Sequence, residues 1–582
     1  MERKKLMKRI KVVTVIMTIM LAVSGCGKGD SNKDKNEKQN VSENNNLEYI
    51  HLSMVNPETI NPINNNNQSV GYILDLVYDS LFTIDSNYNA VPQLVEEYSM
   101  ASDGRSINIK LKDVNWHNGK PVTSDDVEFT IDSIKRSENS SYKPLVENIS
   151  SVTSTDNKNL TIHFTQPYAF SIDNLIFPIV SKSELSGLNV AESKDYKNNM
   201  VGSGAYKISK FNKKSNMVLT LNEDYYDKEK IKDAKKEINV MIVPDEAAQV
   251  SMTLALSSDI TKVGISDLSE FQEDEFKITN YEGRGYEYMI FNYSNPIMND
   301  INFRKAISYG IDKKKILSEA YLGNVSDVNF PLHSKSKYYD SSIKPIGYNV
   351  EKAKESLGKI DIDKVNSNAA GKDDASKKEE NNKKEENNKK EEAAKKEENS
   401  KKEETNKESK EAKKAREEKE KSEKLKEAIK NLNLKIVVNK ENSERVKAAH
   451  LIRENLNEMG IKSTVEELEG DALAQALDKK EYDLALVGWE LSSVPDATDI
   501  INYSGYTNEK LTNYLNSLKS SKSVDDTKSI YKSIQKYVND NVAFVSLGIT
   551  DDYLVTNKRI TGNLKPNDFD IYEGIYNLGF KE

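Results

Sequence analysis

The feature that most limits how this chain can fold lies near its start, where the only cysteine follows a short apolar run. Basic residues between Lys4 and Lys11 precede a largely apolar stretch, residues 12–23, which leads into Cys26. This order is typical of a secretory signal, and the run is shorter than the roughly 20 apolar residues that a spanning helix needs. One cysteine cannot form an internal disulfide, so stability must come from the buried core.

Val23-Ser24-Gly25-Cys26 resembles the lipobox of bacterial lipoproteins. The resemblance implies that residues 1–25 are removed as a signal peptide and that the Cys26 thiol carries diacylglycerol. Two or three acyl chains, at ~0.8 kcal/mol per buried methylene, would then hold the protein at the extracytoplasmic face of the cell membrane. A plain signal peptide with an incidental cysteine is the alternative.

Length and composition narrow the possibilities further. The 582 residues predict two or three lobes. A net charge of −9 and a pI near 5.5 argue against nucleic-acid binding. Residues 26–46 are polar without an apolar run, which predicts a flexible tether spanning roughly 25 Å. The 29 tyrosines suit a wet, adaptable binding surface, although genome bias would give the same count.

Periodicity predicts the first folded elements. Residues 49–54 alternate as a strand does, and the apolar spacing of residues 70–82 predicts a helix. Asp103-Gly104-Arg105 is expected to join two hairpin strands. Thr123 or Ser124 is expected to cap a helix that opens with an acidic pair.

Several motifs occur in the order typical of one family, the solute-binding proteins of peptide transporters (family 5, oligopeptide- and dipeptide-binding type), which this chain resembles. The motifs are Trp116-x-x-Gly119-x-Pro121-Val122-Thr123, Gly202-x-Gly204-x-Tyr206, Asn222-x-x-Tyr225-Tyr226, Tyr288–Asn292, Phe303–Asp312, Asn455–Ile461 and Tyr482-Asp483-Leu484. The resemblance implies an α/β fold with two lobes, of the periplasmic-binding-protein type (type II, cluster C), with an extra subdomain in lobe I and a hinge. The implied boundaries are 47–291 for lobe I with its subdomain at about 83–190, 292–365 and 425–543 for lobe II, and 544–582 for the return to lobe I.

Residues 366–424 form a Lys/Glu-rich insertion where the family has a short connection. It includes five copies of a Lys-Lys-Glu-Glu-x-x hexad, residues 377–406. A six-residue step advances 600° on a helix, so three copies distribute their side chains evenly and no apolar stripe arises. The tract is expected to be a lone solvated helix or a disordered chain, and to act as a surface loop or as a spacer.

The family resemblance also indicates a ligand site between the lobes, where a peptide pairs as an added strand. The strand after Tyr482 is expected to present Gly488 and Trp489 at its exit, with plain core as the alternative for Trp489. The Asn67-Gln68-Ser69 loop corresponds to a ligand-contacting segment of the family, and Tyr288 or Asn292 is expected to face the cleft.

Three residues after this tryptophan, peptide-binding members carry an Asp that pairs with the ligand's α-ammonium, whereas this chain has Ser492. A buried ammonium would lose a strong interaction there. Glu490, Asp496 or Asp499 is a possible substitute from a neighbouring turn. Otherwise the ligand lacks a free amine at that place, as a blocked or cyclic peptide or a non-peptide does.

The function expected from this resemblance is capture of oligopeptides, or a related solute, by hinge closure, and their delivery to the permease subunits of an ABC importer by a monomer. A peptide-signal sensor and a metal- or metallophore-binding protein are alternatives. The five histidines show no metal-ligand spacing: they are His51, His117, His163, His333 and His450. No nucleophile motif or phosphate loop is found, so neither enzymatic activity nor a cofactor is expected.

Overall fold

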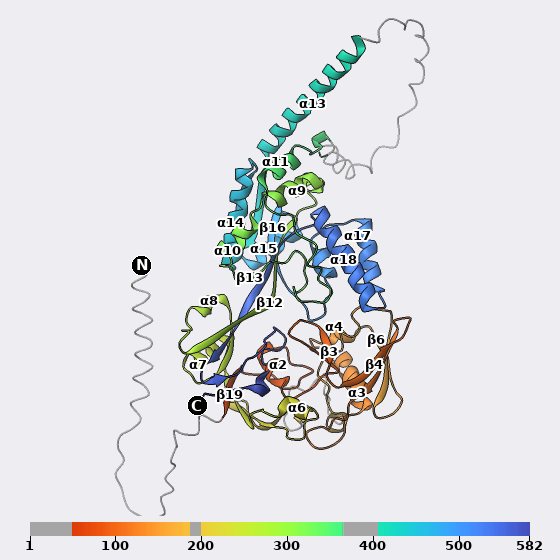
Figure 1. The fold of residues 1–582 in the computed structure, drawn as a ribbon, viewed down its shortest axis with the longest axis vertical. Coiled ribbons are helices and arrows are strands. Elements are labelled where there is room, and N and C mark those ends of the chain that lie inside the picture. Colours follow the sequence, from red (N-terminus) through yellow and green to blue (C-terminus); the bar gives the residue numbers. More distant parts are fainter. Residues whose placement is uncertain (1–48, 187–199, 364, 366–404, 582) are drawn as a thin grey trace, which may run out of the picture. The chain divides into compact units, whose positions relative to one another are not determined.

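The computed structural model of the protein describes residues 49–186, 200–363, 365 and 405–581 (Figure 1). The predicted signal peptide, Cys26, the tether and nearly all of the hexad repeats lie outside these residues. Within the described part of the chain, no helix combines the length and the apolar character needed to cross a membrane.

A four-stranded sheet forms the base of lobe I. Its strand order is β1 (Ile50–Val55), β10 (Glu237–Val243), β9 (Asn216–Leu221) and β8 (Tyr206–Asn212), with β1 parallel to β10 and the other pairs antiparallel. The alternation predicted for residues 49–54 is confirmed, since Ile50, Leu52 and Met54 are buried in the core. Helix α2 (Gln68–Leu74) begins where the Asn67 side chain accepts the N–H of Val70.

The helix predicted over residues 70–82 is wrong in its second half. α2 ends at Leu74, and residues 75–80 turn toward strand β2 (Phe82–Ile84). Val77 is buried as its spacing predicts, but its carbonyl accepts the N–H of Gly204 instead of continuing a helix. A partner from elsewhere in the chain therefore outweighs the local helical pattern.

This contact also explains the Gly-x-Gly motif. A Cβ on Gly202 would overlap the carbonyl oxygen of Val77, and one on Gly204 would lie 2.7 Å from that of Leu76. His117, from the Trp116 motif, donates its N–H to Gly202 O and has its Nε2 2.9 Å from Gly204 O. The two motifs are thus one packed unit of the scaffold.

The extra subdomain has a four-stranded antiparallel sheet with the strand order β4 (Val95–Met100), β5 (Ser106–Leu111), β7 (Asn159–Phe164) and β6 (Ile149–Ser154). The predicted hairpin turn is confirmed, with Gly104 at φ +69°. Helix α3 (Ser124–Arg136) begins with a capping box between Thr123 and Asp126, which confirms Thr123, one of the two predicted caps. A short ribbon pairs β2 with β3 (Ala90–Pro92).

A seven-stranded sheet continues from lobe I into lobe II. Its order is β11 (Ile260–Val263), β17 (Val545–Asn557), β12 (Phe276–Phe291), β16 (Leu484–Glu490), β14 (Asn433–Asn439) and β15 (Lys462–Leu468), with β13 (Val325–Ser326) also paired to β17. The long strands β12 and β17 pair with each other antiparallel (Figure 1). β17 also pairs with β11, and β12 also pairs with β16. They therefore carry the chain between the lobes.

Lobe II is completed by helices whose apolar faces pack on this sheet or on one another. They are α9 (Ile301–Gly310), α10 (Lys313–Glu319), α11 (Val350–Leu357), α14 (Ser443–Glu458), α15 (Gly470–Asp478), α16 (Thr498–Tyr503), α17 (Glu509–Lys519) and α18 (Val524–Asn541). The remaining short elements are α4 (Lys143–Val146), α5 (Lys182–Leu185), α6 (Lys228–Ile231), α7 (Glu246–Leu254), α8 (Ile265–Leu268), β18 (Ile560–Thr561), β19 (Gly579–Phe580) and 3-10 turns at Pro296–Asn299 and Ile575–Asn577.

The C-terminal part of the charged insertion is helical. Helix α13 (Thr405–Asn431) runs from the insertion into lobe II, and residues 413–424 are all exposed (Figure 1). Leu425 is buried in the lobe II core. Of the two expected states, the solvated helix therefore holds for residues 413–424.

Candidate functional site

A cavity of about 640 Å³ lies where the end of β16 faces lobe I. We call it the interlobe cavity. Its walls come from the turn after α2, the extra subdomain, the end of β16 with the segment that follows it, and the C-terminal residues 569–576, with Lys230 and Arg284 in addition. Residues that matter below are Asp75, Tyr142, Lys230, Arg284, Glu490, Ser492, Asp570 and Glu573.

Strand β16 brings its exit to this cavity through its pairing with β12. Trp489 lies opposite Tyr286, and Glu490 lies opposite Gly285. The chain then turns at Leu491, whose carbonyl accepts Nε of Arg284 at 2.6 Å. Ser492 consequently lines the interlobe cavity.

The wall of the cavity formed by lobe I is acidic. Asp75 is an exposed residue that lines the cavity, and desolvation by the protein around it raises its pKa well above the usual value, with a further contribution from Asp570. Burial likewise raises the pKa of Asp570. Two carboxyl groups that resist ionisation in this way would be stabilised as anions by a cation placed between them.

A smaller pocket of about 100 Å³, the side pocket, adjoins the exit of β16. Lobe I supplies Tyr88 and Phe569, whereas lobe II supplies the other lining residues: Pro331, Leu332, His333, Ser336, Trp489, Leu491, Ser492, Ser493, Val494, Pro495, Asp496, Asp499 and Ile500. The rings of Tyr88 and His333 stack with centroids 3.5 Å apart and an interplanar angle of 3°. The two lobes therefore meet directly at this pocket.

The stacked pair is anchored to the crossing strand β12. The Tyr88 hydroxyl donates to the carbonyl oxygen of Glu282, and Nδ1 of His333 lies 3.1 Å from the Glu282 carboxylate. Burial lowers the pKa of His333, whereas hydrogen bonds from His333 and Ser334 outweigh burial and lower the pKa of Glu282. At neutral pH the pair is thus a neutral imidazole that donates to a carboxylate.

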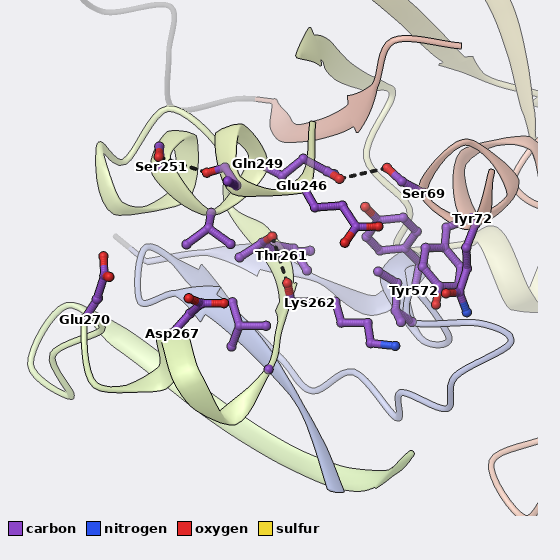
Figure 2. A pocket seen from close by; sticks show the side chains of 17 residues that line it. Ser69, Tyr72, Glu246, Gln249, Ser251, Thr261, Lys262, Asp267, Glu270 and Tyr572 are labelled. Atoms are coloured by element: carbon purple, nitrogen blue, oxygen red, sulfur yellow. Dashed lines mark hydrogen bonds between the residues drawn. The ribbon is translucent and has the colours of Figure 1, made fainter. Parts of the chain in front are cut away.

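A further cavity, of about 490 Å³, lies within lobe I (Figure 2). Gln68 and Ser69 line it, and Figure 2 shows Ser69 joined to Gln249 of α7, at 3.0 Å. Lys262 extends toward Tyr72 and Tyr572 and forms ion pairs with Asp552 and Asp568. Tyr572 also lines the interlobe cavity, so its side chain lies between the two.

The structure separates the predicted site residues into three groups. Glu490, Ser492 and Trp489 line the interlobe cavity or the side pocket, and Asp496 lines the side pocket, where it accepts the Tyr168 hydroxyl at 2.9 Å. Asn67 and Gln68 line a neighbouring space of about 300 Å³ that also contacts Arg284. Ser69 faces the lobe I cavity instead.

Two predicted residues do not face a cleft in this structure. Tyr288 is fully buried beside Tyr286 and Phe544. Asn292 is buried, and its amide donates to the carbonyls of Lys480 and Tyr482. The expected exposure is therefore wrong for both, because the strand they end is covered on both faces by lobe II.

The presence of glycine at position 488 has a structural explanation that the sequence does not show. Arg445 of α14 forms a two-point ion pair with Glu287, with Nε–Oε2 at 2.7 Å and Nη2–Oε1 at 2.6 Å. A Cβ on Gly488 would overlap Nη2 of Arg445. Glycine at this position leaves room for a buried salt bridge that ties α14 to β12.

Other cavity residues were missed because no local signal marks them. Asp75, Arg284 and Asp570 are far apart in the chain and belong to no recognised motif. In the sequence, His333 stands out only as a histidine without metal-ligand spacing. Among the described residues, no cluster of three or more His, Cys, Asp or Glu side chains could hold a metal ion.

The two strands that cross between the lobes, β12 and β17, pair irregularly at one point along their length. The pairing of β12 with β17 shifts register between Glu282 and Tyr286 and again between Glu287 and Tyr288. A Cβ on Gly283 would lie 2.8 Å from the carbonyl oxygen of Thr550. This bulge lies about seven residues before the predicted boundary at 291/292, directly beside Arg284 and the cavities.

The match to a family model decides the classification of the chain. Residues 89–395 match the model of the bacterial extracellular solute-binding proteins, family 5 (middle region), which is more than half of the chain. The chain belongs to family 5. The predicted two-lobe, type II periplasmic-binding-protein fold of this family 5 protein is likewise confirmed by its structural neighbours.

Two relatives illustrate the similarity. A Brucella abortus protein, provisionally described as an ABC transporter peptide-binding protein, is 24% identical over 302 residues, which cover 50% of this chain and only 55% of the relative. The oligopeptide-binding protein AppA of Bacillus subtilis is 21% identical over 590 residues, which cover 97% of this chain and 96% of AppA.

Two solved structures share the fold over 92% of this chain. The substrate-binding protein CtaP of Listeria monocytogenes has a TM-score of 0.68 at 20% identity and covers 92% of this chain and 99% of its own. AppA of B. subtilis, solved in complex with a nonapeptide, has a TM-score of 0.56 at 19% identity, with 92% and 99% covered.

Proposed function

We propose that the protein captures oligopeptides in the interlobe cavity and delivers them to the permease subunits of an ABC importer. The observation that carries the proposal is the interlobe cavity itself, which lies at the exit of β16 and is walled by both lobes. The relationship to AppA, which is named as an oligopeptide-binding protein and was solved with a nonapeptide, supports the same ligand class.

Capture would work through closure of the lobes. A ligand that contacts both walls stabilises the closed form, because those contacts are lost when the lobes separate. Strands β12 and β17 allow such a motion at their bulge, where Gly283 and Gly285 interrupt the regular pairing. The backbone of the β16 exit supplies hydrogen-bonding groups that do not depend on ligand sequence.

We place the mature protein outside the cytoplasmic membrane, anchored by lipid at Cys26 and working as a monomer without catalysis. The family name, which describes extracellular solute-binding proteins, supports the compartment. The lipobox resemblance of residues 23–26 supports the anchor.

Native mass spectrometry of protein purified from its host tests the ligand class. We expect a ladder of peptide masses, which denaturation strips and which rebinds after refolding. Small-angle scattering should show a smaller radius of gyration after rebinding. One unique mass would instead favour the sensor or metallophore reading, and a stripped protein that rebinds no peptide would contradict the proposal.

A pair of serine variants ties the cargo to the cavity. Ser493→Tyr places a ring inside the interlobe cavity, whereas Ser520→Tyr adds the same ring on the surface at the end of α17. We expect only the first variant to lose the peptide ladder. Equal loading of both would show that peptides bind elsewhere.

A further inference from the structure

An aromatic side chain of the extra subdomain is buried inside lobe II. Phe170 is 0% exposed, and its ring centroid lies 5.7 Å from that of Tyr338 and 6.0 Å from that of Tyr531. Among the described residues of the core cluster that these rings share, Phe170 is the only buried member that precedes residue 286. Lobe I therefore inserts one phenylalanine into the core of lobe II.

The site that receives Phe170 is held in shape by lobe II itself. The Tyr531 hydroxyl donates to the carbonyl oxygen of Pro495 and accepts the N–H of Ala497. Phe330 packs edge-to-face against the same ring, with centroids 6.0 Å apart. These partners keep the Tyr531 ring in position without Phe170, so the receiving site is preorganised.

Residues close in the chain to these rings form two further bonds between the subdomain and lobe II. The Tyr168 hydroxyl donates to the Asp496 carboxylate at 2.9 Å, and the N–H of Lys337 donates to Oδ1 of Asn89 at 3.3 Å. Such bonds are exchanged for bonds to water when the lobes separate, whereas the apolar surface of the Phe170 ring has no such compensation. Burial of the ring is therefore the main contribution of this contact.

The contact is separate from the surfaces that would hold a ligand. Of the described residues Phe170, Tyr338 and Tyr531, none lines the interlobe cavity or the side pocket. The free energy of this contact is consequently available to the empty protein, because it requires only that the two lobes meet. A ligand then has to supply only the remainder of the free energy of closure.

We propose that Phe170, seated between Tyr338 and Tyr531, is a clasp that holds the two lobes together without ligand and sets how often the empty protein opens. The extra subdomain thereby has a role of its own, which is to carry the clasp to lobe II. The clasp does not depend on what the interlobe cavity binds. It can therefore fail while the proposed function stands, and the reverse is also true.

Single-molecule fluorescence energy transfer measures opening directly. In a chain carrying Cys26→Ser, which removes the only native thiol, Ser151→Cys in β6 and Ser517→Cys in α17 place two dyes at exposed positions. We expect stripped protein to populate a closed state, with the higher transfer, in the absence of ligand. Phe170→Ala should lower the closed-to-open ratio by at least about tenfold, since burial of a phenylalanine ring corresponds to roughly one to two tenfold steps.

Phe164→Ala is the matched control, because Phe164 is buried in the lobe I core of the same subdomain. It should lower the melting temperature and leave the ratio unchanged. Tyr168→Phe covers the case in which Phe170→Ala does not fold: it removes only the bond to Asp496 and should lower the ratio severalfold, whereas Tyr98→Phe, 46% exposed on β4, should not.

An unchanged ratio in folded Phe170→Ala overturns the clasp, as does an unchanged ratio in Tyr168→Phe if the former variant is unfolded. A wild type that stays open in the absence of ligand also overturns it. Opening that becomes frequent only in the variants that loosen this contact supports it.

Discussion

At the scale of residues, two positions show how burial decides a role that composition leaves open. Arg445 and Glu287, which belong to different elements, meet beside Gly488 and leave no room there for a side chain. Asp173 is 3% exposed, and one of its carboxylate oxygens has no hydrogen-bond partner. The first position is a packing constraint and the second is an electrostatic cost, and both can be tested by single substitutions.

We expect Gly488→Ala to destabilise the protein. The new methyl group displaces the Arg445 guanidinium from Glu287, and overpacking of this kind costs about 1–3 kcal/mol, with more lost if the buried pair separates. Urea denaturation followed by circular dichroism measures the change. Gly347→Ala is the matched control, because a Cβ there meets nothing within 4 Å. Equal midpoints for the two variants would contradict the packing argument.

Asp173→Asn should stabilise the protein near neutral pH. Burial raises the pKa of Asp173 from 3.8 to about 6, so between these values the folded state binds more protons than the unfolded state. Wild-type stability should therefore rise as the pH falls from above 6 toward 4, by up to about 3 kcal/mol from this group. The asparagine variant should lack that part of the slope.

Melting curves at pH 7.5 and pH 4.5 measure this difference. We expect Asp173→Asn to melt higher than the wild type at pH 7.5, with the advantage largely gone at pH 4.5. Asp274→Asn, at an exposed carboxylate, should follow the wild-type curve. An advantage that persists unchanged at pH 4.5 would show that the gain is not electrostatic.

At the scale of elements, helix α13 separates a solvated arm from a packed anchor. Lys421 lies 3.9 Å from Asp363, so the insertion returns close to the point where it leaves lobe II. Residues 413–424 are exposed, and the first buried side chain that follows is Leu425. The arm should therefore contribute little to stability, whereas its anchor should contribute as core residues do.

We expect replacement of residues 366–420 by a short Gly/Ser linker to change the free energy of unfolding by less than about 0.5 kcal/mol, as for exposed surface. Leu425→Ala should cost about 2–5 kcal/mol because it leaves a cavity in the lobe II core. Lys424→Ala, one position earlier on the exposed side, is the control. A strongly destabilised linker variant would show that the arm packs against the lobe.

At the scale of the whole molecule, the lobes, their crossing strands and the expected lipid anchor define where the protein would work. The lipid anchor is inferred from residues 23–26 alone, whereas the capture mechanism is inferred from the cavity between the lobes. The two are independent, so each needs its own test.

We expect Cys26→Ser to release the protein from the membrane fraction and to abolish labelling with palmitate, because no other residue offers the thiol. Partition into Triton X-114 measures the change. Placing a cysteine five residues further on, as Ser31→Cys in the Cys26→Ser background, should not restore labelling. Membrane association that survives Cys26→Ser would exclude a lipid anchor at this residue.

The family, the order of the elements and much of their chemistry can be read from the sequence alone. Motifs such as Gly202-x-Gly204 and the Thr123–Asp126 cap are local, and they are dictated by backbone contacts that tolerate few residue types. The strand of residues 484–490 could likewise be read from its apolar run. Ser492 lines the interlobe cavity and follows that strand by two residues.

Features that depend on long-range contacts could be seen only in the three-dimensional structure. The end of α2 depends on Gly204, the burial of Tyr288 and Asn292 on the covering of β12, and the side pocket on rings from residues 88, 333 and 569. These groups are separated by tens to hundreds of residues and share no periodicity. Folding brings these groups together, and local patterns in a single sequence do not indicate which distant residues will meet.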